Sequence, residues 1–147
     1  MSQDNSDAPL SHQSANRERM LLCPKPQLAF MAEESPKRIL VVDDEPTVCR
    51  ILTDLLTLDG HAVHIATTPG DAIELCRMRH FDLVFLDYYL PEMTGDKLVG
   101  IIKRTSPRQK IVLMTGQRPF PRVGEAEFLI RKPFTTEVVR DVIARFA

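Results

Sequence analysis

A run of four large apolar residues, 83–86, ends at a single aspartate and constrains the fold more than any other stretch of the chain. Such a short run predicts a strand buried on both faces, which is typical of a parallel sheet covered by helices. Asp87 then stands at the edge of the predicted core, where burying a charge is costly unless cations or donors compensate it. Asp87 could cap the following loop or carry chemistry, and the rest of the chain decides between the two.

Residues 1–36 are polar and contain several prolines, without sustained apolar periodicity, so we expect a disordered N-terminal extension. Met31 shortly before the first strand resembles a natural start, and the residues before it could reflect start-codon choice.

Residues 37–147 are long enough for one domain with its own core. No apolar run approaches the roughly 20 residues of a membrane span. A net charge of -1 favours neither nucleic acid nor an acidic membrane as the main partner. The three cysteines are odd in number and lack the paired spacing of zinc sites, which is typical of a reducing cytosol, so we expect a cytoplasmic protein.

Short apolar runs alternate with helical patterns throughout residues 37–147. This alternation predicts an α/β fold, a doubly wound five-stranded parallel sheet with helices on both faces. The predicted strands are 39–42, 61–66, 83–86, 110–115 and 128–131.

Polar side chains stand where four of these strands end, and in a parallel sheet those ends meet at one crevice. Three carboxylates in one crevice repel one another, and Mg²⁺ is the simplest compensation for hard oxygen ligands. A metal-bound aspartate facing a lysine and a hydroxyl is suited to accept a phosphoryl group. The residues are Asp43, Asp44, Asp87, Thr115 and Lys132.

Residues 37–147 resemble the receiver domain of two-component response regulators. The motifs that carry the resemblance are Asp43-Asp44, the Asp87 loop with Pro91 and Gly95, Thr115-Gly116 and Lys132-Pro133-Phe134. The resemblance implies a flavodoxin-like receiver fold with strand order 2-1-3-4-5. It also implies a cis bond between Lys132 and Pro133.

The resemblance further assigns a role to each residue at the strand ends. Asp87 would be the phosphoacceptor, and Thr115 and Lys132 would contact the phosphoryl oxygens. Asp44, Asp87 and the backbone carbonyl of Tyr89 would hold Mg²⁺, with Asp43 acting directly or through water.

The implied phosphoryl donor is a phosphohistidine on a sensor histidine kinase or a histidine phosphotransfer protein. No effector domain follows Ala147 in the sequence, so we expect a single-domain, chemotaxis-like regulator that signals through contact with a downstream protein, with a homodimer possible. We expect no enzyme activity beyond self-phosphorylation and self-dephosphorylation on Asp87.

Two features depart from the family pattern. Receivers usually place a full fourth helix between the fourth and fifth strands, but residues 116–127 contain two prolines and two glycines. We therefore expect this helix to be shortened or absent. The position three before Lys132, usually an aromatic that couples to the threonine, is Leu129. Phe128 beside it points to the other face by the period of two, so the customary coupling is not expected.

Two other functions are compatible with parts of the pattern. A phosphatase with an aspartate nucleophile, acting on small phosphate esters, would need a second acidic residue where this chain has Tyr89, and a substrate-enclosing cap. A non-phosphorylated interaction module would have no physical need for unpaired carboxylates at the strand ends.

Overall fold

The computed structural model describes residues 35–118 and 121–146. The predicted disordered extension, residues 1–36, lies outside the described residues except for Ser35 and Pro36. Within the described ranges, no helix has the length and apolar character needed to cross a membrane.

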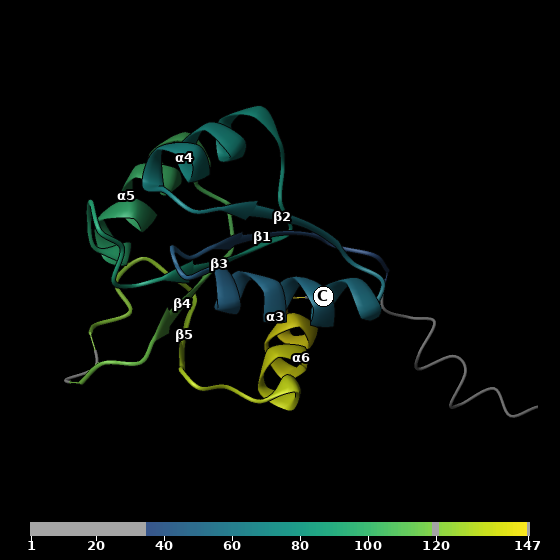
Figure 1. The fold of residues 1–147 in the computed structure, drawn as a ribbon. Helices are drawn as coiled ribbons and strands as arrows, with labels where there is room; N and C mark the ends of the chain where they lie inside the picture. The colour runs from purple at the N-terminus through teal and green to yellow at the C-terminus, as the bar shows by residue number, and fades with distance from the viewer. Residues whose placement is uncertain (1–34, 119–120, 147) are drawn as a thin grey trace, which may run out of the picture. The chain divides into compact units, whose positions relative to one another are not determined.

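Five parallel strands form one sheet in the order β2-β1-β3-β4-β5, which confirms the predicted fold (Figure 1). Every residue of the central strands β3 and β4 is buried, as the continuous apolar runs predict. The strands are β1 (Arg38–Val42), β2 (Ala62–Ala66), β3 (Leu83–Asp87), β4 (Ile111–Thr115) and β5 (Phe128–Arg131).

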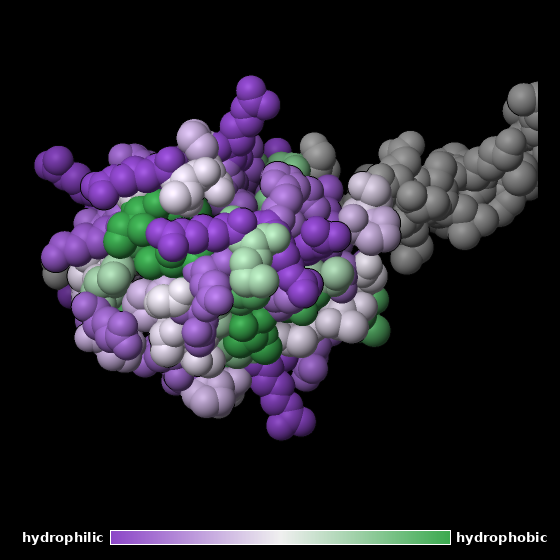
Figure 2. Space-filling model, turned by 90° about the horizontal axis from the view of Figure 1, so that it is seen from above, coloured by the Kyte–Doolittle hydropathy of each residue, from purple (hydrophilic) through white to green (hydrophobic). Residues whose placement is uncertain are grey.

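In the described part of the chain, two helices cover each face of the sheet (Figure 1). Figure 1 shows α4 and α5 above the strands and α3 and α6 below them. Seen from the α4 and α5 side in Figure 2, the surface is hydrophilic over most of its area. The helices are α3 (Pro46–Leu58), α4 (Pro69–Met78), α5 (Gly95–Thr105) and α6 (Thr136–Arg145).

The two cores follow from the alternation of side chains along each strand. In β1, Leu40 and Val42 face the core shared with α4 and α5, whereas Ile39 and Val41 face the core shared with α3 and α6. Leu129 packs against the first core. Phe128 packs against the second, which confirms that it points to the other face.

The helix ends follow from local residue chemistry. Gly60 adopts a φ of 91° after α3, a conformation open to glycine without strain. The Thr68 hydroxyl accepts a hydrogen bond from the amide of Asp71 at 3.1 Å and caps α4. Thr135 caps α6 in the same way, accepting from the amide of Val138 at 3.3 Å.

The connection between β4 and β5 departs from regular strand and helix alternation. Its described residues, 116–118 and 121–127, form bends and turns and contain no helix. Prolines at 119 and 121 and a φ of 62° at Gly124 are poorly compatible with a continuous helix. The prediction of a shortened or absent fourth helix is therefore confirmed for the described residues.

The loop after β3 closes tightly onto the start of α5 at Gly95. The Gly95 amide donates to the carbonyl of Tyr88 at 2.6 Å. A Cβ atom at Gly95 would lie 2.8 Å from the Tyr88 Cα and 2.9 Å from the Asp87 carbonyl oxygen. Only a residue without a side chain fits here, so Gly95 fixes the path of the chain just past Asp87.

We predict that Gly95→Ala destabilises the domain by about 1–3 kcal/mol, because the added methyl group meets main-chain atoms that cannot move aside freely. Gly100→Ala on the same helix is the matched control, since a Cβ there meets nothing within 4 Å. Replacing that mid-helix glycine stabilises by about 0.5–1 kcal/mol. Urea unfolding of both variants measures the two effects, and equal changes would contradict the steric explanation.

Candidate functional site

The carboxyl ends of β1, β3 and β5 bring three of the predicted site residues into direct contact. The Lys132 ammonium, just past β5, lies 2.7 Å from Asp43 Oδ2 and 3.3 Å from Asp87 Oδ1. Because β4 separates β3 from β5 in the sheet, the lysine side chain reaches past the end of β4 to make both contacts. The bond between Lys132 and Pro133 is cis, as predicted.

Asp44 joins this group and completes an acidic cluster. One carboxylate oxygen each of Asp43, Asp44 and Asp87 lies within 4.8 Å of the others. The single positive charge of the Lys132 ammonium is smaller than the combined negative charge of the three carboxylates. A set of hard oxygen donors with excess negative charge fits a small divalent cation.

Asp43 is the most deeply held of the three carboxylates, with no exposed surface. Its Oδ1 accepts from the amide of Glu45 at 2.9 Å, and its carbonyl accepts from the thiol of Cys49 at 3.2 Å. The sequence predicts neither the Glu45 nor the Cys49 contact, and it indicates only a small apolar side chain at Cys49. An aspartate bonded to the amide two residues on is a common turn, so the Glu45 contact had a recognisable local signal.

The acid–base properties of Asp87 follow from its surroundings. Burial and the nearby negative charge of Asp43 raise the pKa of Asp87 from 3.8 to about 6, although Lys132 and the Tyr89 amide partly oppose the shift. Burial disfavours the charged form of Lys132, but its contacts with Asp43 and Asp87 outweigh this and raise its pKa. At neutral pH the site therefore holds a charged lysine beside a carboxylate that is poorly stabilised as an anion.

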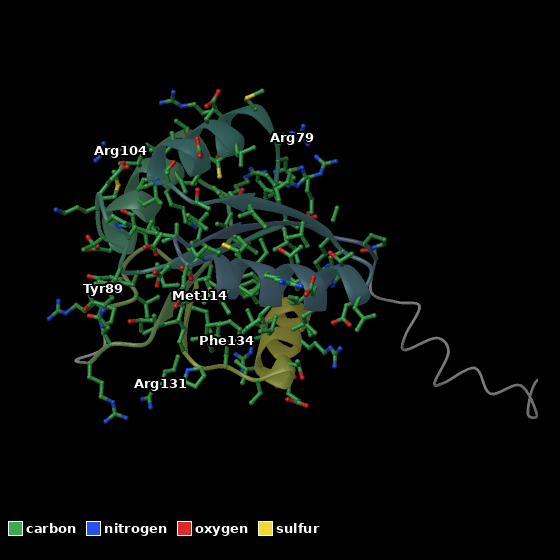
Figure 3. All side chains as sticks on the ribbon, viewed as in Figure 1. Arg79, Tyr89, Arg104, Met114, Arg131 and Phe134 are labelled. Atoms are coloured by element: carbon green, nitrogen blue, oxygen red, sulfur yellow. The ribbon has the colours of Figure 1, made fainter. Side chains whose placement is uncertain are left out.

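Thr115 and Tyr89 stand at the same edge of the sheet. Thr115 is fully buried, its hydroxyl accepts from the Gln117 amide at 3.3 Å, and its carbonyl accepts from the Lys132 amide at 2.7 Å. Because the hydroxyl accepts in the Gln117 bond, that bond does not use its proton. Figure 3 shows Tyr89 beside the carboxyl ends of the strands. Its ring packs edge-to-face on Tyr88 at 4.8 Å, and its carbonyl stays a predicted ligand.

A family model described as "Response regulator receiver domain" matches residues 39–144. The chain belongs to this receiver-domain family. The matched range includes every residue of the site and all five strands apart from Arg38 at the start of β1, so the family assignment covers both the fold and the cluster of charged side chains.

Curated relatives of this receiver are larger proteins. It is 30% identical over 116 residues to the response regulator protein FleR of Pseudomonas aeruginosa, which covers 75% of this chain and 24% of FleR. It is 41% identical over 73 residues to the sensor histidine kinase AruS of the same organism, covering 50% of this chain and 7% of AruS. The receiver thus spans about a quarter or less of these two relatives.

Solved receiver structures have the same fold as this chain. The response regulator TrrA from Thermotoga maritima, in complex with Mg²⁺ and BeF, matches with a TM-score of 0.70 and 28% identity, over 76% of this chain and 99% of that one. A receiver domain from Methanospirillum hungatei gives 0.68 and 26%, over 76% and 94%. The complex of TrrA with the histidine kinase ThkA gives 0.68 and 27%, over 75% and 97%.

We predict that the Asp87 carboxyl contributes stability to the metal-free receiver at low pH, and that this contribution is lost as pH rises from about 4 to 6. A folded-state pKa raised above the unfolded value stabilises the fold below the unfolded pKa, and the effect is lost as pH rises through the folded pKa. Asp87→Asn removes this dependence. At pH 7.5 its free energy of unfolding should exceed that of the native receiver by about 1–2 kcal/mol, and at pH 3.5 the two free energies should be equal.

Urea unfolding in the presence of a chelator, at a series of pH values, measures the difference. Asp54→Asn, on the exposed surface of α3, is the control and should follow the native curve. A constant difference between Asp87→Asn and the native receiver across this pH range would contradict the raised pKa.

Proposed function

We propose that this receiver accepts a phosphoryl group on Asp87 within a two-component phosphorelay. The observation that carries the proposal is the Asp87 carboxylate held between the Lys132 ammonium and the carboxylates of Asp43 and Asp44. Membership of the receiver family supports it. The domain would comprise residues 37–147, with residues 1–36 as an extension.

The residues of the site suggest how the transfer proceeds. Above pH 6 the Asp87 carboxylate is mostly ionised, and one of its oxygens attacks phosphorus while the phosphorus–nitrogen bond of a phosphohistidine breaks. The leaving imidazole keeps the bonding electron pair. The Lys132 ammonium, already 3.3 Å from Asp87, neutralises charge on the transferred oxygens. The Thr115 hydroxyl donates to one of them.

Magnesium is the proposed cofactor. Asp43, Asp44 and Asp87 would hold it together with the backbone carbonyl of Tyr89, and their oxygen donor set fits that ion. When bound, Mg²⁺ would neutralise negative charge on the phosphoryl oxygens.

We propose a sensor histidine kinase or a histidine phosphotransfer protein as the donor. TrrA, a structural relative, has been solved with the histidine kinase ThkA, which supports this class of partner. The output would be contact with another protein in the cytoplasm, or a second copy of the chain, rather than with nucleic acid or membrane. Catalysis would be confined to phosphorylation and dephosphorylation of Asp87 itself.

We predict that incubation with acetyl phosphate and magnesium adds one phosphoryl group to the full chain, detected by intact-protein mass spectrometry. Asp87→Asn should show no adduct, because the amide cannot act as the nucleophile. Asp54→Asn, which alters an exposed carboxylate outside the site, should be modified like the native chain. An adduct on Asp87→Asn, or none on the folded native chain, would refute the assignment.

We also predict that magnesium raises the melting temperature of the native receiver, because a bound cation relieves the repulsion among three clustered carboxylates. The increase should be largely lost in Asp44→Asn, which removes an exposed ligand without disturbing the buried Asp43 and Lys132 pair. Differential scanning calorimetry with and without magnesium tests this, and an equal increase in both proteins would exclude Asp44 as a ligand.

A further inference from the structure

The position of Lys132 depends on β5, a four-residue strand at the edge of the sheet beside β4. The register pairs Phe128 with Val112 and Arg131 with Thr115. A slip of one residue would turn Lys132 to the other face, and a slip of two would move it about 7 Å along the strand. Either slip would break the contacts of the Lys132 ammonium with Asp43 at 2.7 Å and with Asp87 at 3.3 Å. The register of β5 therefore determines whether Lys132 reaches the two carboxylates.

Glu127, immediately before β5, binds both main-chain groups of the first residue of β4. Its amide donates to the Ile111 carbonyl at 2.9 Å, and its carboxylate Oε2 accepts from the Ile111 amide at 2.6 Å. In a continuing parallel ladder that amide would meet a main-chain carbonyl. Here the chain turns at Gly124, and a side chain supplies the acceptor instead.

The same carboxylate is anchored to helix α5. Lys103 donates to Glu127 Oε1 at 2.5 Å and to the carbonyl of Gln109 at 2.5 Å. The side chains of Lys103 and Glu127 are 12% and 22% exposed, so this ion pair is largely shielded from water. Helix α5, the turn before β4 and the start of β5 therefore meet at one carboxylate. Where a receiver usually has a helix, the described residues between β4 and β5 offer none.

We propose that Glu127 is a positioning residue for phosphoryl transfer, fixing the register of β5 through Ile111 and thereby holding Lys132 against Asp43 and Asp87. This deepens the proposed phosphoacceptor function and rests on it. The far end of β5 is held by the Lys132 amide, which donates to the Thr115 carbonyl at 2.7 Å. Bonds at both ends leave a short edge strand little freedom to slide, and of the two bonds between Glu127 and Ile111, the one to the Ile111 amide depends on a single side chain.

An ion pair that merely stabilises the fold makes a different prediction, and two double variants separate the two. Lys103→Met with Glu127→Leu removes both charges and the acceptor for the Ile111 amide. Lys103→Met with Glu127→Gln also removes both charges but keeps an amide oxygen able to accept that hydrogen bond. Replacing both partners of a buried pair avoids leaving an isolated charge, so both variants are expected to fold.

The first measurement is the initial rate of phosphoryl adduct formation in the full chain with acetyl phosphate and magnesium, at a temperature where circular dichroism shows both variants folded. We expect the glutamine variant to stay within about threefold of the native rate. The leucine variant should be about tenfold slower or more, because sub-ångström placement of Lys132 is lost. Equal rates in the two variants would overturn the proposal and leave Glu127 a purely stabilising role.

The second measurement is amide hydrogen exchange, which does not depend on phosphorylation. The amides of Ile130 and Lys132 should exchange faster in the leucine variant than in the glutamine variant, with β1 and β3 unchanged. Should the native chain take up no phosphoryl group, the proposed function fails while exchange still decides whether Glu127 fixes the strand. If the leucine variant does not fold, Lys103→Met with Glu127→Ala makes the same comparison, and unchanged β5 exchange there refutes the role of Glu127.

Discussion

One ammonium group ties together the ends of three strands that are distant in sequence. Asp43 has no exposed surface, and its charge is tolerable in the folded chain because Lys132 lies 2.7 Å from it. Breaking a buried ion pair by removing one partner typically costs about 3–5 kcal/mol. The lysine is thus a structural requirement of the resting protein as well as a proposed participant in chemistry, and both roles need β1, β3 and β5 in register.

Each layer of the structure contributes to holding those strand ends. The two cores are built from alternating residues of the same strands, so any slip that exposed one core would also displace the site. The close packing at Gly95 fixes the path of the loop that follows Asp87. The bonds of Glu127 with Ile111 and Lys103 hold the start of β5, where the described residues of the connection from β4 form no helix.

The sheet, the alternation of elements and the gathering of Asp43, Asp44, Asp87 and Lys132 could be predicted from the sequence, because strand burial and topology alone bring those positions to one edge. The opposite faces of Phe128 and Leu129 followed from the period of two in the same way. The contacts of Cys49 and Glu127 could not be predicted, since they depend on where main-chain amides and carbonyls point after folding, whereas a local turn signal was available for the Glu45 contact.

The double contact of Lys132 also bears on the energetics of switching. Both anionic partners of Lys132 are present before any phosphoryl group arrives, so for this lysine modification would exchange one anionic partner for another. Such an exchange requires little reorganisation of the surrounding dipoles. The resting receiver retains the repulsion among its three clustered carboxylates, so the free energy that distinguishes its two forms would combine that repulsion with the new contacts of the modified aspartate.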